Sequence, residues 1–577
     1  MGHMTEHTYD LVVRGGTVYD GTGTPGRSAD IAVTDGKIVV VGAVSGTGAE
    51  EIDARGLIVT PGFVDIHTHY DGQALWSDQL APSSWHGVTT AVMGNCGVGF
   101  APCKPQDRTA LIALMEGVED IPAAVMHEGL NWRWESFPEY LEVVDSMPRD
   151  IDLCALVPHA PIRVFVMGER ALRLEPATPD DVARMRELVA EAIRAGAFGV
   201  STSRSIAHRN CAGDFTPTLL ARESEIAGLV MGLDDAGRGI FEVVGESGDS
   251  EVVGEFELIR RSLEKSGRPG VFSLIQSGSQ PNKNQWRELM ELADRAIEEG
   301  VSLRPVVAPR SISILLGLEG SQNPFSGTAT YREIAALPLD ERVAIMKDPA
   351  IRRRILSDDP TEFSTFALMS RIPYWNMFRF GDPPNYTPSA SESIAAIAER
   401  DNRDPADIAY DIMLESDGMG FIYVPFANYA SGDLSVCEEM LANPNTIMGL
   451  GDGGAHVGFI LDAGFPTWLL TYWVKDRRRF SLEEAVRRLT SDTAESVGLS
   501  DRGRIDVGLR ADLNVIDFDR LNFGPPYVAY DLPAGGRRLL QKANGYQATI
   551  VAGRTVYRNG VDTGARPGRL VRSGSVH

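Results

Sequence analysis

The stretch Leu57–Asp71 reads LIVTPGFVDIHTHYD, an apolar run of strand length that ends in two histidines spaced two positions apart. Residues i and i+2 of a strand point to the same side, so His67 and His69 present both imidazoles to one face. At the carboxyl end of a strand in a (β/α)-barrel, that position lies on the rim where active sites are built. The pair therefore predicts a cation site on the opening strand of such a barrel.

Seven further apolar runs alternate with helical segments, which is typical of βα units around a parallel sheet. One intervening helix is clearly marked: Thr178 can cap it, Pro179 occupies its first position and Gly196 ends it. With the opening strand, these runs supply the eight strands of a closed (β/α)8 TIM-like barrel. The seven runs are 89–96, 153–158, 197–203, 239–244, 270–276, 301–308 and 446–452.

The sequence pattern at both ends of the chain differs from the alternating strand and helix pattern of the central part. Short β-branched runs broken by turn dipeptides occur before about residue 58 and return after about residue 503. We predict that the two ends form one small β-sandwich domain, from residues 5–60 and 496–577, beside a barrel domain at 61–495. The segment 309–428 is too long for an ordinary connection and predicts an inserted subdomain or lid.

Composition limits the class of function. The 577 residues include 55 Lys and Arg against 79 Asp and Glu, and the net charge of −24 disfavours nucleic acid and anionic membranes as partners. No run of about 18 apolar residues and no secretion signal is found, so we expect a soluble protein. Five irregularly spaced cysteines argue against a disulfide framework and favour the cytoplasm. A homo-oligomer is possible, because the sequence does not determine the oligomeric state.

Three further residues at predicted strand ends are candidates for chemistry. Cys96 ends the second strand in GNCG, where a thiolate ligand and an inert buried cysteine are equally open interpretations. Asp452 lies in LGDGGAH after the last strand, where a carboxylate could bind a metal and move a proton, or only form a turn. His456, four residues later, contacts either substrate or solvent.

The ordered motifs PGFVDIHTHYD, TTAVMGNCGVGFAP, LVPHAPIRVFVMG, GAFGVSTS, GLGDGGAH and RGRIDVGLRADLNVID carry a family resemblance. Together they resemble the N-acyl-D-amino-acid deacylase (D-aminoacylase) branch of the metal-dependent amidohydrolase superfamily, from about residue 9 to beyond residue 517. The resemblance implies a metal site formed by His67, His69 and Cys96, with Asp452 as the catalytic carboxylate.

The sequence departs from that branch at the second metal position. Members carry one histidine at the end of strand five and another at the end of strand six, where this chain places Val244 and Leu274; His208 and His456 are consecutive histidines. A standard binuclear centre is therefore not expected. Glu242 shares a strand face with Val244 and could supply an oxygen ligand, although an ion-paired glutamate is equally open. We expect one divalent metal per chain, zinc by donor type, with Fe, Mn or Co as alternatives.

The substrate contacts also differ. The branch's carboxylate clamp uses a lysine after strand six and a tyrosine after strand four, where this chain has Gln276 and the stretch RSIAH. Arg163, Arg204 or Arg310 could replace the clamp, although a loop arginine is more often solvated. His159, in VPHAPIR at the end of strand three, could orient substrate or only satisfy backbone groups at the rim.

The leading hypothesis is hydrolysis of a C–N bond in an amide or N-acyl amino acid, in which a metal lowers the pKa of a water and Asp452 takes its proton and later returns it to the departing nitrogen. A second hypothesis redirects the mononuclear site to a cyclic amide, a lactone or a C–C bond. A third is a degenerate barrel that serves as a binding or scaffold subunit. Metal stoichiometry separates enzyme from scaffold.

Overall fold

A computed structural model of the chain describes residues 8–245, 252–277, 284–359 and 372–574. The outer limits of the predicted β-domain, 5–7 and 575–577, lie outside these ranges, as do residues 360–371 of the predicted insertion.

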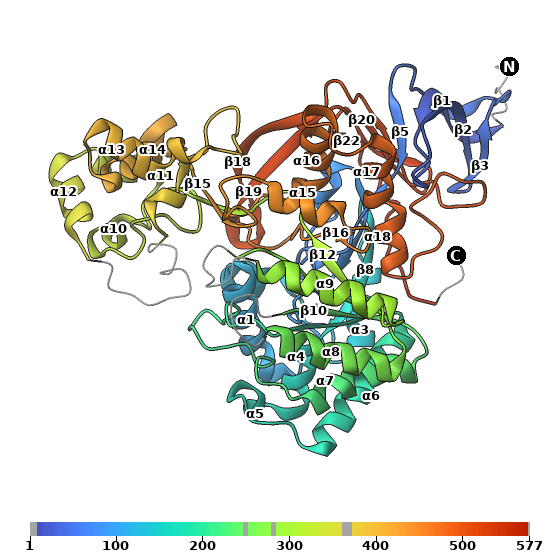
Figure 1. Cartoon of the computed structure of the whole chain (residues 1–577), viewed down its shortest axis with the longest axis horizontal. Helices are drawn as coiled ribbons and strands as arrows, with labels where there is room; N and C mark the ends of the chain where they lie inside the picture. The colour runs from blue at the N-terminus through green and yellow to red at the C-terminus, as the bar shows by residue number, and fades with distance from the viewer. Residues whose placement is uncertain (1–7, 246–251, 278–283, 360–371, 575–577) are drawn as a thin grey trace.

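All eight predicted barrel runs form strands of one parallel sheet (Figure 1). The sheet closes because the chain just beyond its first strand pairs with the chain just beyond its last: Thr68 and Gly453 form a parallel bridge, and the His69 N–H donates to the Gly453 carbonyl at 2.8 Å. The predicted (β/α)8 barrel is confirmed. Its strands are β6 (Phe63–Asp65), β7 (Val88–Met93), β8 (Asp152–Pro158), β9 (Gly199–Ser203), β10 (Ile240–Val244), β11 (Gly270–Ser273), β12 (Leu303–Val307) and β16 (Ile447–Met448).

Amphipathic helices cover the barrel sheet. In α6 the Thr178 hydroxyl accepts from the Asp181 N–H, and the Asp181 carboxylate accepts from the Thr178 N–H, so both ends of a capping box are made. Gly196 ends α6 with φ 120, as its position predicts. No helix in the described ranges has the length and apolar content needed to cross a bilayer. The main barrel helices are α1 (Arg108–Glu119), α3 (Phe137–Asp145), α4 (His159–Met167), α6 (Pro179–Ala195), α7 (Glu223–Asp235), α8 (Val252–Ser266) and α9 (Gln285–Glu298).

The two chain ends meet in one nine-stranded sheet, as predicted. Its members come from β1 (Tyr9–Val18), β2 (Arg27–Thr34), β3 (Lys37–Gly42), β4 (Gly48–Asp53), β5 (Ile58–Pro61), β17 (Leu513–Ile516), β20 (Tyr546–Val551), β21 (Arg554–Arg558) and β22 (Val561–Asp562). The opening run is thus divided, with β5 in this sheet and β6 in the barrel. Gly62 makes the crossing possible, because a Cβ there would collide with the Thr89 side chain.

The segment predicted as an insertion forms a lobe with its own apolar cluster, at the left of Figure 1. Its small sheet comprises β13 (Ile312–Leu316), β14 (Phe378–Arg379) and β15 (Ile422–Ala427), with helices α10 (Ala329–Ile334), α11 (Leu339–Met346), α12 (Pro349–Ser357), α13 (Ile394–Asp401) and α14 (Pro405–Gly418). A hairpin of β18 (Asn522–Leu532) and β19 (Gly536–Asn544) was not predicted; its Leu539 N–H donates to the Val457 carbonyl, beside the last barrel strand.

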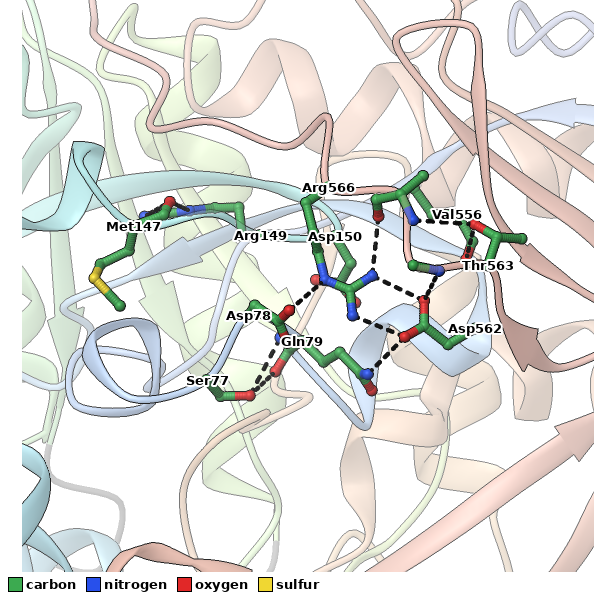
Figure 2. Close-up of polar contacts among 12 residues, drawn as sticks. Ser77, Asp78, Gln79, Met147, Arg149, Asp150, Val556, Asp562, Thr563 and Arg566 are labelled. Carbon is green, nitrogen blue, oxygen red and sulfur yellow. Dashed lines mark hydrogen bonds and ion pairs between the residues drawn. The ribbon is translucent and has the colours of Figure 1, made fainter.

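The C-terminal segment fastens the loop that follows the first barrel strand (Figure 2). Arg566 donates to the Asp78 carboxylate at 2.8 Å and to Asp562 at 2.7 Å, and Gln79 donates to the same Asp562 carboxylate at 2.8 Å. The Arg566–Asp78 and Gln79–Asp562 bonds join residues that are almost 500 positions apart in the sequence. Through these two bonds the β-domain holds the loop at residues 77–79, which begins eight residues after His69.

A buried ionic cluster joins the barrel to the C-terminal segment at the start of β8. The fully buried Asp152 carboxylate accepts from Arg502 at 2.6 Å and from Arg510 at 3.0 Å, and Arg502 also donates to the Thr90 hydroxyl. The motif RGRIDVGLRAD therefore has a structural role, because two of its three arginines, Arg502 and Arg510, bind one carboxylate beneath the barrel.

We predict that Asp152→Ala lowers the free energy of unfolding by about 3 kcal/mol, because it removes the fully buried carboxylate that Arg502 and Arg510 share and leaves the buried Arg502 with only Asp501 and a longer contact to Asp512. Urea unfolding followed by circular dichroism measures the change. The control is Asp53→Ala, which removes a solvent-exposed pair with Arg55 and should change the midpoint little. Equal effects of the two substitutions would contradict the role assigned to the cluster.

Candidate metal centre

Three predicted ligands converge at the carboxyl ends of the first two barrel strands. His67 and His69 follow β6, Cys96 follows β7, and all three side chains are buried with their ligand atoms within 4.8 Å of one another. The Cys96 Sγ lies 3.4 Å from His67 Nε2 and 3.7 Å from His69 Nε2. Both imidazoles thus turn Nε2 toward the thiol, as their period-2 spacing predicts.

Asp452 brings a fourth donor from the last strand. Its Oδ1 lies 3.3 Å from His67 Nε2 and 3.7 Å from His69 Nε2, and its N–H donates to the His67 carbonyl at 3.1 Å. Asp452 has φ 48, a conformation that is uncommon for residues other than glycine. It is held here by the pairing between the segments that follow the first and last barrel strands, which we call the barrel seam. Tetrahedral zinc sets its donor atoms about 3.3–3.6 Å apart, close to the separations of Asp452 Oδ1 from the two imidazole nitrogens. The three-residue donor cluster found among the described residues contains His67, His69 and Cys96 but not Asp452.

Burial sets the protonation of these groups. It lowers the pKa of His67 to about 4 and of His69 to about 3, so both imidazoles are neutral near pH 7 and free to bind a cation. Burial, with Glu119 as the next cause, raises the pKa of the Cys96 thiol well above its usual value. A cation reverses that effect by stabilising the thiolate, so the donor set fits a divalent metal.

Glu242 lies behind the histidine and thiol rather than between them. Its Oε2 accepts the Cys96 N–H at 3.2 Å, and its Oε1 is 4.0 Å from Nδ1 of His67, the ring nitrogen that faces away from Cys96. The carboxylate is not part of the three-residue donor cluster found among the described residues. This placement favours orientation of Cys96 and His67 over direct metal binding, and the predicted ligand role stays a prediction.

Glu119 is a residue of the site that the sequence reasoning missed. It ends α1 and is only 1% exposed, and its carboxylate lies 3.3 Å from His69 Nδ1. One signal was available: Glu119 follows Leu111 and Met115 at four-residue intervals, so it occupies the apolar stripe of its helix. A charge in a core-facing stripe is unusual and marks a candidate functional residue.

Two predicted substrate contacts lie in a buried network of their own. His159 is fully buried, with Nδ1 2.8 Å from the Thr202 hydroxyl and Nε2 3.0 Å from Glu225. Arg163 donates to the same Glu225 at 2.7 Å and to the Glu175 carbonyl at 2.6 Å. These bonds favour a structural role for both residues, and their contact with substrate is untested.

The other predicted substrate contacts differ in how many of their hydrogen-bonding groups already have a partner within the protein. Gln276 pairs with Asn428 through its backbone, and its side-chain Oε1 accepts the Ala430 N–H at 3.1 Å; Arg204 pairs with Glu255. Arg310 donates one nitrogen to Asp462 and to the Leu461 carbonyl, whereas its buried Nε and Nη1 have no hydrogen-bond partner in the described parts of the chain. Of the three arginines considered for the clamp, Arg310 is therefore the one with unused buried donors.

His456 lies beside the donor cluster. Its Nε2 is 3.6 Å from the Glu119 carboxylate, its side chain is 21% exposed, and burial lowers its pKa to about 4. Its buried Nδ1 has no hydrogen-bond partner within the described ranges. The structure thus gathers His67, His69, Cys96, Asp452 and His456 at one end of the barrel.

The fold and the donor cluster define a (β/α)8-barrel protein with a candidate His-His-Cys metal site on its strand ends and an aspartate beside it. The chain belongs to the amidohydrolase family, whose model matches residues 50–557. It is 27% identical to D-aminoacylase of Alcaligenes xylosoxydans xylosoxydans over 582 residues, which cover 99% of each chain.

Two solved structures share the fold. A D-aminoacylase, reported with a binuclear metal centre showing one-metal activation and second-metal attenuation, has a TM-score of 0.66 at 23% identity. An N-acyl-D-glutamate deacylase from Bordetella bronchiseptica, complexed with zinc and a phosphonate inhibitor, has a TM-score of 0.64 at 23% identity. Each match covers 98% of this chain and all of the other.

We predict that Glu242→Gln keeps a bound metal but weakens its affinity about 10- to 100-fold, because the amide oxygen can still accept from Cys96 N–H while the negative charge is lost. Competition with a chromophoric chelator measures the affinity. Complete loss of metal, as expected for a removed ligand, would contradict the orienting role.

Proposed function

We propose that this protein is a metal-dependent hydrolase that cleaves the amide bond of N-acyl-D-amino acids or closely related N-acyl compounds. The observation that carries the proposal is the placement of the Asp452 carboxylate within 3.7 Å of both metal-facing imidazole nitrogens. Family membership and the likeness to D-aminoacylases along almost the whole chain support the C–N bond as the target.

We propose one zinc ion per chain, held by His67, His69, Cys96 and Asp452. Imidazole and thiolate donors, with a carboxylate oxygen 3.3 and 3.7 Å from the two ring nitrogens, favour zinc. Val244 and Leu274 stand where the resemblance expects the histidines of a second position, and neither side chain can bind a metal. The one-metal activation reported for a solved D-aminoacylase is consistent with catalysis by a single ion.

Bound in this way, the ion supplies the Lewis acidity that makes a water molecule nucleophilic near neutral pH. Asp452 is the proton carrier: its carboxylate accepts a proton from the attacking water and returns it to the departing nitrogen, so the amine leaves neutral. The seam between the first and last strands holds this carboxylate in place through the Asp452 N–H bond to His67. The neutral imidazoles of His67 and His69 direct their Nε2 atoms toward Asp452, at the carboxyl ends of the barrel strands.

We propose that Arg310 binds the substrate carboxylate. Its Nε and Nη1 donors have no partner among the described residues, and either can donate a single charge-assisted hydrogen bond to a carboxylate oxygen, since Nη2 is already bound to Asp462 and Leu461. Its anchors Leu461 and Asp462 line the same small cavity as Asp452, so the arginine is fastened to the loop that carries the catalytic group. A free carboxylate on the substrate would complete its hydrogen bonding.

A non-catalytic scaffold is the weaker candidate. It would have no need to keep an aspartate in a left-handed backbone conformation beside two buried imidazoles. A cyclic amide, a lactone or a substrate cleaved at a C–C bond could be processed with the same metal ligands. None of these reactions requires a substrate carboxylate for Arg310 to bind.

We predict that the purified protein binds about one zinc, releases product from N-acyl-D-amino acids, and loses activity on chelation until metal is restored. Asp452→Asn should retain much of the metal and lower kcat about 10²- to 10⁴-fold, because an amide cannot accept and return the proton. Metal analysis and a panel of N-acyl-D- and L-amino acids, anilides and lactones test this. Full activity of metal-free protein, or of Asp452→Asn, would refute the mechanism.

We predict that Arg310→Lys raises KM about tenfold or more for an N-acyl-D-amino acid, because a single ammonium cannot bind Asp462 and also donate to the substrate carboxylate from the positions of Nε or Nη1. For the corresponding C-terminal amide, which lacks the charge, KM should change little. Steady-state kinetics on the two substrates measures the difference. The control is Arg204→Lys, since Arg204 already pairs with Glu255; equal changes for acid and amide would rule out the clamp.

A further inference from the structure

Glu119 contacts two histidines that come from opposite sides of the barrel seam. Its Oε1 lies 3.3 Å from Nδ1 of His69, and its Oε2 lies 3.6 Å from Nε2 of His456. Its backbone carbonyl also accepts the His456 N–H at 2.5 Å. One residue at the end of α1 therefore touches a predicted metal ligand after the first strand and a site histidine after the last.

The contact with His69 joins two atoms that otherwise lack partners. Neither Nδ1 of His69 nor Oε1 of Glu119 makes a hydrogen bond to any described residue, although both are buried. Since Nε2 of His69 faces Cys96 and Asp452, a neutral ring that binds a cation there carries its proton on Nδ1. A small rotation of the ring aligns that N–H with the carboxylate.

Packing stability does not explain a carboxylate at this position. Glu119 occupies a helix stripe whose preceding members, Leu111 and Met115, are apolar core residues. Its side chain is only 1% exposed, so its charged form is costly to bury. An apolar side chain would avoid this cost, so the carboxylate is explained by the two histidines that it contacts.

We propose that Glu119 is a positioning residue that fixes the ring of His69 for metal binding and, through its second oxygen, holds His456 against the same centre. The inference rests on the proposed function and adds to it a direct link between the metal ligands and the loop that follows Asp452.

The neighbouring Asp120 strengthens that link. Its carboxylate accepts from the Gly458 N–H at 3.2 Å and from the Ser321 hydroxyl at 2.6 Å. The end of α1 thus binds the loop of the last strand at two points and reaches the inserted lobe through Ser321. Movement of that loop would be transmitted to His69 through Glu119.

The test compares Glu119→Gln and Glu119→Ala with Glu116→Gln. Glu116 lies on the same helix, is partly buried and accepts the Ala123 N–H, but contacts neither histidine, which makes it a matched control. We expect zinc affinity to fall about 10- to 100-fold in Glu119→Ala and by less in Glu119→Gln, with no change in the control. The visible spectrum of the cobalt-substituted protein should shift in the Glu119 variants, which altered packing alone would not cause.

A second measurement addresses His456. Glu119→Ala should raise KM in the otherwise unchanged chain, and it should raise KM no further when His456→Ala is already present, because the shared contact is then absent. Folding of each variant is checked by circular dichroism. Glu119→Gln preserves side-chain volume, so the test remains decisive if Glu119→Ala does not fold.

The two proposals fail in different ways. If both Glu119 variants bind zinc as tightly as the unchanged chain and give the same cobalt spectrum, the positioning role is wrong while the hydrolase proposal stands. If the unchanged chain binds no zinc or cobalt, the hydrolase proposal fails and the positioning role fails with it.

Discussion

The pairing that closes the barrel is the constraint on which the site depends. Three backbone interactions, Thr68 with Gly453, His69 N–H to Gly453 and Asp452 N–H to the His67 carbonyl, join segments that are almost 400 residues apart in sequence. Without this seam the two histidines and the aspartate belong to unrelated loops. With it, one register sets the separation between Asp452 and both imidazoles, and the same hydrogen bonds hold Asp452 in its unusual conformation.

The β-domain supports this seam from both sides. The loop that follows the histidine strand is fastened by Arg566 and Asp562 (Figure 2), and the loop that follows Asp452 is contacted by Leu539 of the hairpin. Beneath the barrel, Asp152 binds two arginines of the C-terminal segment. The chain ends thus restrain the loops that carry the ligands, which is how a barrel rim built from loops can keep ligand atoms within a few tenths of an ångström.

The barrel and the four donors could be predicted because they depend on local patterns. Apolar runs identify the strands, and a strand end places His67, His69, Cys96 and Asp452 on the rim whatever the details of packing. Glu119 could not be assigned in this way, because its role depends on where the end of α1 meets two loops from distant parts of the chain. His159 and Arg163 were predicted to contact substrate because they are suitable side chains near a strand end. The local pattern could not show that Glu225, from a helix one βα unit later, forms hydrogen bonds with both.

Several acidic groups are buried around the site. Glu242, two residues before Val244 at an expected histidine position, contributes one carboxylate, and Glu119 adds another behind His69. Burial raises the pKa of Glu242 to about 8 and that of the Cys96 thiol well above its usual value, so an anion at any one of these positions disfavours an anion at the others. The single divalent cation proposed above would relieve this repulsion for Cys96 and Asp452 together, and it would polarise the imidazoles so that their Nδ1–H groups favour charged partners. The two glutamates lie on that outer side of the rings, where a carboxylate can balance a cation that it does not bind.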